Sequence, residues 1–108
     1  MSAGDKDQTV YTLVVQVGRK TGDGLPKGAS GAGLLCYAAA ADEAEAVRET
    51  VSVLEVAGLA PLDVTAYGTL AEREAGDGVA EDERLLIAQA LCEDAVVVAE
   101  VTPFFGEP

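Results

Sequence analysis

The sequence predicts an α+β fold, a two-layer sandwich in which a four-stranded, mostly antiparallel sheet carries two helices on one face. Four apolar segments have the length of strands, and two longer segments repeat apolar residues every three or four positions, as amphipathic helices do. The length of 108 residues, 49% of them hydrophobic, suits a single domain. We assign this domain to residues 9–105, between a flexible N-terminus (1–8) and a C-terminal end (106–108).

Two predicted strands and a glycine-rich loop form the first third of the chain. Residues 10–17 alternate, and the face that carries Thr12 and Gln16 is the more polar of the two. Residues 34–40 are predicted as the second strand, although its last alanines could equally begin a helix. The loop between these strands, residues 18–33, contains six glycines and is long for a hairpin connection.

The first helix has the clearest pattern in the chain. Asp42 and Glu45 have the spacing of a capping box, with Asp in place of the usual Ser or Thr. Val47 and Leu54 lie on the apolar stripe that follows, and Gly58 suits the position just after a helix C-terminus. These features predict an amphipathic helix over residues 42–57, packed on an apolar surface.

The rest of the chain continues as strand, helix and strand. Residues 61–68 alternate as a strand with one polar face, and Thr69 begins a short helical turn with capping-box spacing. A second long helix is predicted at 79–93, where acidic residues in the first turn suit the helix dipole. Residues 95–102 are nearly all apolar, which is typical of a covered strand. The order β-β-α-β-α-β is ferredoxin-like in broad architecture, with its strands rearranged, and architecture alone carries no function.

Composition excludes several classes of function. Only 7 Lys and Arg stand against 19 Asp and Glu, a net charge of −12, which argues against nucleic acid as a partner. The chain has no His, so His-based acid–base catalysis and most mixed-ligand zinc sites are excluded. The two acidic clusters lie in first turns of helices, where they stabilise the helix without a ligand. We therefore expect no cofactor, no metal and no catalytic residue.

The chain also lacks the segments that mark export or membrane insertion. Its polar start has no apolar signal region, and no apolar run approaches the ~20 residues needed to cross a bilayer. Cys36 and Cys92 are far apart in the sequence and are interpreted as reduced, buried thiols. A pairing between them stays open. We expect a cytoplasmic protein with no membrane partner.

The glycine-rich loop is one candidate binding site. It carries three of the seven positive charges, and flexible glycines let backbone N–H groups approach an anion. The loop does not match a P-loop or a dinucleotide-binding motif, and it leads into a strand rather than a helix. The alternative is a solvated turn with no ligand. The candidate anion-binding residues are Arg19, Lys20, Lys27 and Ser30.

A second candidate is a surface for a protein partner. Phe104 and Phe105 follow the last predicted strand, where they either fold back on the core or anchor an interface. Asp63, Thr65 and Tyr67 share one face of the third strand if the alternation holds. These five residues are the candidate partner-binding set.

Three hypotheses of function follow from these features. The leading one is a non-catalytic, small acidic protein that acts as a protein-protein interaction or regulatory module, as a homodimer or with a basic protein partner. The second is a small-molecule or anion-binding regulatory domain that uses residues 18–33. The third is an enzyme that works without His, through Tyr, Asp or Cys.

Overall fold

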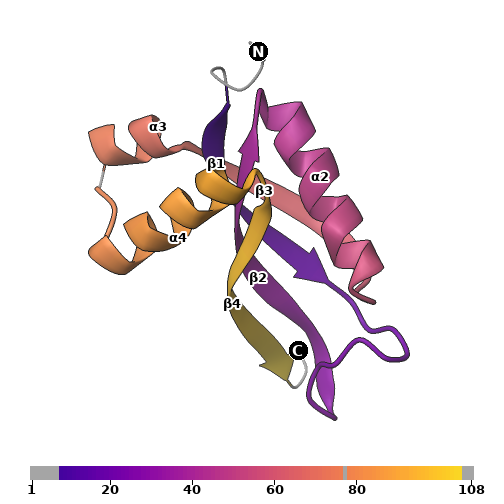
Figure 1. Cartoon of the computed structure of the whole chain (residues 1–108). Helices are drawn as coiled ribbons and strands as arrows, with labels where there is room; N and C mark the ends of the chain where they lie inside the picture. Colours follow the sequence, from indigo (N-terminus) through magenta and orange to yellow (C-terminus); the bar gives the residue numbers. More distant parts are fainter. Residues whose placement is uncertain (1–7, 77, 106–108) are drawn as a thin grey trace.

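The computed structural model describes residues 8–76 and 78–105 of the chain. All four strands form one antiparallel sheet in the order β3-β1-β2-β4. The predicted α+β class, the antiparallel sheet and the chain order are confirmed (Figure 1). The proposed ends, residues 1–8 and 106–108, lie outside the described residues except for Gln8. The elements are β1 (Thr9–Val17), β2 (Ala29–Ala40), α2 (Glu43–Val56), β3 (Pro61–Thr69), α3 (Leu70–Ala75), α4 (Glu81–Glu93) and β4 (Val96–Phe105).

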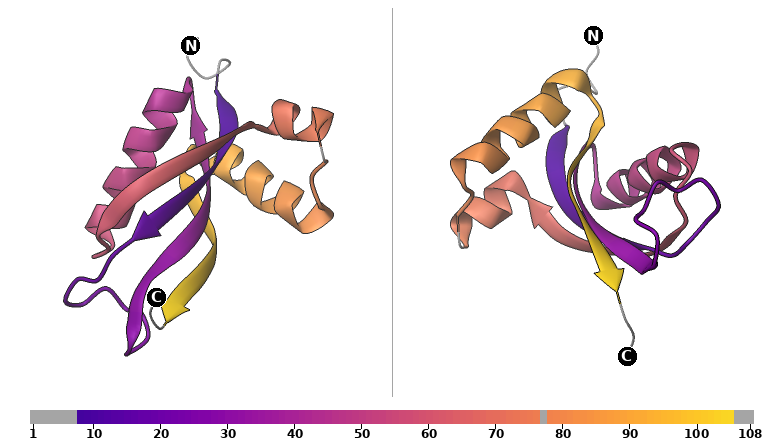
Figure 2. Two further views of the ribbon diagram at one scale, coloured as in Figure 1. Left: turned by 180° about the vertical axis from the view of Figure 1, so that it is seen from behind. Right: turned by 90° about the horizontal axis from the view of Figure 1, so that it is seen from below.

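The two long helices lie on opposite faces of the sheet, which corrects the expectation that both lie on one face. Figure 2 shows the sheet between α2 on one side and α3 with α4 on the other. The reason is that β2 is apolar on both faces. Leu34 packs with Leu54 of α2, whereas Tyr37 packs with Ile87 of α4. We call the two sides the α2 face and the α4 face.

The α2 face is covered along most of the strands by one amphipathic helix. Leu13, Val15 and Leu34 are at most 1% exposed beneath it. The helix begins as predicted, because the Asp42 carboxylate accepts a hydrogen bond from the Glu45 amide at 2.8 Å. Gly58 follows the helix with a φ of 93°, a left-handed conformation that glycine adopts without strain.

The α4 face is covered over only part of its length. Val10, Tyr37 and Ala39 pack beneath Ile87 and Ala90, at the end of the sheet where β1 begins and β2 ends. Because α4 has 13 residues, it is about 20 Å long, whereas the 12 residues of β2 extend for about 40 Å. The far ends of β1, β2 and β4 on this face have none of the described helices over them (Figure 1).

Two strand boundaries differ from the prediction. The second strand begins at Ala29 rather than at residue 34, so Gly31 and Gly33 belong to a strand and the loop is shorter. A Cβ atom at Gly31 would collide with the carbonyl oxygen of Val17, so the hairpin requires glycine there. The last strand continues to Phe105, so the Phe pair lies within it.

The two cysteines lie in different surroundings. Both thiols are free, but only Cys36 is buried, and Cys92 is exposed, which corrects the interpretation of two buried thiols. Burial raises the pKa of the Cys36 thiol to about 11, so it stays protonated and unreactive at neutral pH. Within the described part of the chain, no helix is long and apolar enough to cross a bilayer.

Candidate functional site

The uncovered end of the α4 face is the candidate functional site. Two cross-strand rows build it: Thr65, Val14, Leu35 and Glu100 in one, and Asp63, Gln16, Gly33 and Thr102 in the other. Phe104 extends the patch along β4. We call these nine residues the open half-face. They include three large apolar side chains, two acidic ones and no cation.

A shallow hollow of about 330 Å³ lies on the β4 side of the open half-face. The Phe104 ring forms one wall, because a Cβ at Gly33 would come within 3.3 Å of its Cζ atom. Glycine at this position therefore leaves room for the ring to lie against the sheet. A hollow of this kind accepts an apolar side chain. Its lining residues are Val14, Gly33, Leu35, Glu100, Thr102 and Phe104.

The Phe pair is exposed rather than folded into the core. Phe104 is 40% exposed and Phe105 is 61% exposed, which excludes the alternative in which both cap the core. The Ser30 hydroxyl lies 3.3 Å from the Phe104 carbonyl oxygen and donates to it. Strand β4 also exposes Val98 and Val101. It therefore supplies four of the ten large apolar side chains that are exposed among the described residues.

The free edges of the sheet are less suited to a partner than its face. Each edge strand has a proline and an acidic residue, Pro61 and Asp63 in β3 and Glu100 and Pro103 in β4. Each also shifts register twice against its neighbour. Proline, charge and bulges are the features with which natural sheets prevent edge-to-edge pairing. The open half-face is therefore the better candidate for an interface.

The predicted partner-binding residues separate into two groups. Asp63 and Thr65 lie on the open half-face, on edge strand β3. Phe104 lies on the same half-face, on the other edge strand, β4. Phe105 is at the end of β4. Tyr67 lies elsewhere, in a hollow of about 240 Å³ that it lines with Arg73, Gly76 and Gly78. Sequence reasoning missed Val14 and Leu35, although the partly polar face of the first strand was the signal for an uncovered surface.

The glycine-rich loop is held by its own charged residues. The Arg19 guanidinium contacts both carboxylate oxygens of Asp23, at 3.0 and 3.2 Å, and donates to the carbonyls of Pro26 and Ala29. The backbone amides of Lys20 and Leu25 also donate to this carboxylate. The side-chain hydrogen bond from Arg19, aided by these amides, lowers the pKa of Asp23 to about 2.

This network changes the role expected of the anion-binding candidates. Arg19 closes the turn, so its donors are directed inward at the loop. Lys20 and Lys27 remain exposed, and Ser30 stands in β2 beside Phe104. The structure therefore does not bring the four candidates together as one anion site. Two of the four candidates, Arg19 and Lys20, line one hollow together with Thr21, but that hollow is wide and open to solvent.

A polar cluster that the sequence did not reveal fixes α3 and α4 to the sheet. The Arg73 Nη1 atom donates to Thr12 Oγ1 at 3.0 Å and lies 2.9 Å from Glu83 Oε1. The contact between Arg73 and Glu83 is an ion pair only, because the angles between the two groups are not those of a hydrogen bond. The Tyr37 hydroxyl is buried beside both charges and has no hydrogen-bond partner among the described residues. Burial raises the pKa of Tyr37, and the nearby Glu83 charge raises it further.

We interpret this cluster as structural. One guanidinium links α3, β1 and α4, beside the apolar contacts that Val10, Leu70 and Ile87 make between the same elements. On the α4 face of β1, the Thr12 hydroxyl is the polar exception between Val10 and Val14. That exception is the only signal of the cluster that the sequence contains.

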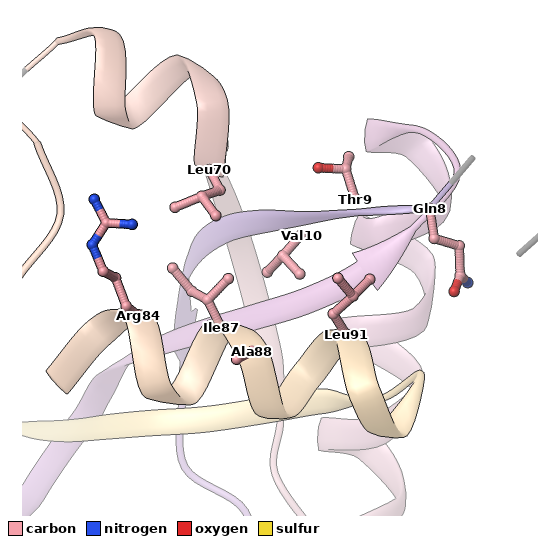
Figure 3. A pocket seen from close by; sticks show the side chains of 8 residues that line it. All are labelled: Gln8, Thr9, Val10, Leu70, Arg84, Ile87, Ala88 and Leu91. Atoms are coloured by element: carbon pink, nitrogen blue, oxygen red, sulfur yellow. The ribbon is translucent and has the colours of Figure 1, made fainter. Parts of the chain in front are cut away.

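A further hollow, of about 340 Å³, lies between α4 and the start of β1; Figure 3 shows the side chains that line it. Leu70, Ile87 and Leu91 project into it, and the Arg84 guanidinium lies at one end, paired with Glu74. The Gln8 amide closes the other end by donating to Asp94 at 2.7 Å. Within residues 8–76 and 78–105, no cluster of His, Cys, Asp or Glu is arranged to hold a metal ion.

Together these observations define a small α+β protein with a sheet covered by helices on both faces and one uncovered half-face. Residues 10–105 match the family described as Domain of unknown function (DUF8846), and the chain belongs to that family. The search of curated proteins and the search of solved structures gave no match.

Proposed function

We propose that this chain is a non-catalytic protein-interaction module whose docking surface is the open half-face. The observation that supports it is the exposure of Phe104 over a part of the sheet that none of the described helices covers. Aromatic residues in partly desolvated hollows supply much of the energy of protein interfaces. The hollow that the Phe104 ring borders, lined by Val14 and Leu35 as well, provides the place for such a residue.

A homodimer through this surface is the second form of the proposal. The apolar centre formed by Val14, Leu35 and Phe104 can face its own copy across a two-fold axis, since such an interface uses one patch twice. In either form, we propose a cytoplasmic location, which the two free thiols support because such compartments keep cysteines reduced.

Site-specific photocrosslinking tests the proposal and can capture a partner of any identity. A benzophenone amino acid replaces Phe104 in one variant and Val56, which is 87% exposed on α2, in the control. We expect an adduct in cells at position 104 and none at position 56. An adduct of twice the chain mass indicates the homodimer, and another mass indicates a different partner. Equal labelling at both positions, or none at position 104, would contradict the proposal.

A further inference from the structure

The charges on the open half-face indicate the chemistry of its partner. Its acidic residues stand on opposite edge strands, Asp63 on β3 and Glu100 on β4, with apolar residues between them. Both side chains belong to exposed residues. No Lys or Arg is among the nine residues, and the whole chain carries a net charge of −12. The surface therefore contains an apolar hollow lined on one side by Glu100, and it has an acidic residue at each edge of the sheet; we call Asp63 and Glu100 its acidic rim.

We propose that the occupant is an extended segment of another protein with one large apolar side chain between two cationic ones. This inference rests on the proposed docking surface and adds the identity of its partner class. The apolar side chain fills the hollow beside Phe104, and the two cations meet Glu100 and Asp63. Such complementarity gives specificity and speeds association more than it adds affinity.

The spacing of the acidic residues fixes the spacing of the cations. Neighbouring strands lie about 4.8 Å apart, so β3 and β4 are separated by about 14 Å across the sheet. Asp63 and Glu100 stand in rows two residues apart, so the diagonal between them is about 16 Å, a distance that long Lys or Arg side chains can bridge from backbone positions about 13 Å apart. An extended segment rises about 3.3 Å per residue, and side chains at i, i+2 and i+4 lie on one face. The arrangement that fits is cation at i, apolar residue at i+2 and cation at i+4.

A second copy of the chain fits this rim less well. If two copies pair through their open half-faces, the only charged residues that each copy presents to the other are Asp63 and Glu100, so no acidic residue finds a cation. Like charges across an interface oppose binding, and two chains of net charge −12 repel at longer range. Salt screens both effects. A homodimer should therefore strengthen as salt rises, and a complex with a cationic segment should weaken.

Binding to synthetic peptides tests the inference directly. The probe is a nine-residue peptide with the central sequence Lys-Thr-Leu-Thr-Lys, and its controls replace both Lys by Glu or the Leu by Ser. Titrations into the ¹⁵N-labelled full chain are followed by NMR at 50 and 500 mM NaCl. We expect binding of the Lys-Leu-Lys peptide alone, with shifts at Val14, Leu35 and Thr102 and an affinity that falls at least threefold at high salt.

Charge variants assign the effect to the rim. Asp63→Asn and Glu100→Gln should each weaken binding about two- to fivefold, the range typical of exposed ion pairs. Glu55→Gln, on the exposed side of α2, is the matched control and should change nothing. Because all three positions are exposed, the fold should survive each substitution, which the unchanged spectra of the free variants would verify.

The outcomes separate the partner class from the docking surface. If the Glu peptide binds as well as the Lys peptide, or if both rim variants bind like the parent, the cationic partner is refuted while the surface stands. The same holds if no peptide binds and the chain instead dimerises through Phe104 more tightly at high salt. If the Lys peptide binds away from the open half-face, the docking surface itself is refuted.

Discussion

The two faces of the sheet differ in how much of their apolar surface is covered. On the α2 face, one helix of 14 residues packs along the strands, and Leu13, Val15 and Leu34 are almost fully buried. On the α4 face, helices cover only the end that contains Val10 and Tyr37. On the α2 face the core is nearly complete over β1 and β2, while Val98 and Val101 of β4 stay exposed; the α4 face is divided into a covered and an uncovered end. The difference leads us to propose that stability resides in the first face and binding in the open part of the second.

The largest expected effect is a loss of stability on substitution in β2. It should differ between Leu34 and Leu35, neighbouring residues whose side chains point to opposite faces of the sheet. Leu34→Ala should lower the free energy of unfolding by about 3 kcal/mol, because it opens a cavity in the fully buried core beneath α2. Leu35→Ala should cost about 1 kcal/mol, since Leu35 is only partly buried. Urea unfolding followed by circular dichroism measures both. Equal losses would contradict the division between the faces.

The next largest loss of stability is expected at the polar cluster of Thr12, Arg73 and Glu83, on the covered part of the α4 face. Arg73→Met leaves the Thr12 and Glu83 oxygens without their cation, and we expect a loss of about 1–2 kcal/mol because the pair is partly exposed. The matched control, Arg48→Met, removes a cation from α2 that makes no ion pair among the described residues and should cost less than about 0.5 kcal/mol. If both variants unfold at the same urea concentration, the cluster does not fasten the helices.

Tyr37 makes the covered part of the α4 face sensitive to alkaline pH. Its pKa is raised above 10 in the folded chain, by burial first and by the Glu83 charge second, so the folded state retains the proton longer than the unfolded state. The stability that this provides is complete below pH 10 and is lost as pH rises through the folded-state pKa. Tyr37→Phe should reduce the dependence of the free energy of unfolding on pH in that range. An unchanged slope between about pH 9 and 11 would refute the assignment.

The glycine-rich loop should respond at the acidic end of the pH range. Because the pKa of Asp23 is lowered from 3.8 to about 2, its contribution to stability is present above pH 3.8 and lost as pH falls through 2. Asp23→Asn removes this dependence and should speed amide exchange at Lys20 and Leu25, whose N–H groups donate to the carboxylate. Exchange rates equal to those of the parent chain would contradict the closed turn.

The elements were predictable from sequence because their signals are local. Asp42 with Glu45 and Thr69 with Glu72 indicate two helix starts, and in the structure both pairs form the expected cap hydrogen bonds. The start of β2 was missed because Gly31 and Gly33 resemble loop residues, whereas the close approach of Val17 and of the Phe104 ring requires them in a strand.

The placement of the helices and of the site depended on tertiary contacts. An amphipathic helix shows that it has a partner surface but not which face of the sheet provides it. The unbroken apolar run Leu34–Ala40 was the available signal that both faces of β2 are covered. The open half-face could not be predicted as a unit, since it joins residues from four strands, although Asp63, Thr65 and Phe104 were selected from the sequence.

At Phe104, a small expected effect on stability accompanies the largest expected effect on binding. Phe104→Ser should change the free energy of unfolding by less than about 1 kcal/mol, because the ring is already 40% exposed. It should nevertheless abolish binding to the Lys-Leu-Lys peptide. A variant that is strongly destabilised would place Phe104 in the core instead, and the assignment of the open half-face would fail.

The most direct test of the central claim is an NMR map of the residues whose amides shift on binding. The spectra come from the peptide titration and from a concentration series of the free chain, so that either occupant is detected. We expect the largest shifts on β1, β2 and β4, at Val14, Gly33, Leu35 and Thr102, with α2 unchanged. Shifts concentrated on α2, or around the hollow of Figure 3 between α4 and β1, would contradict it.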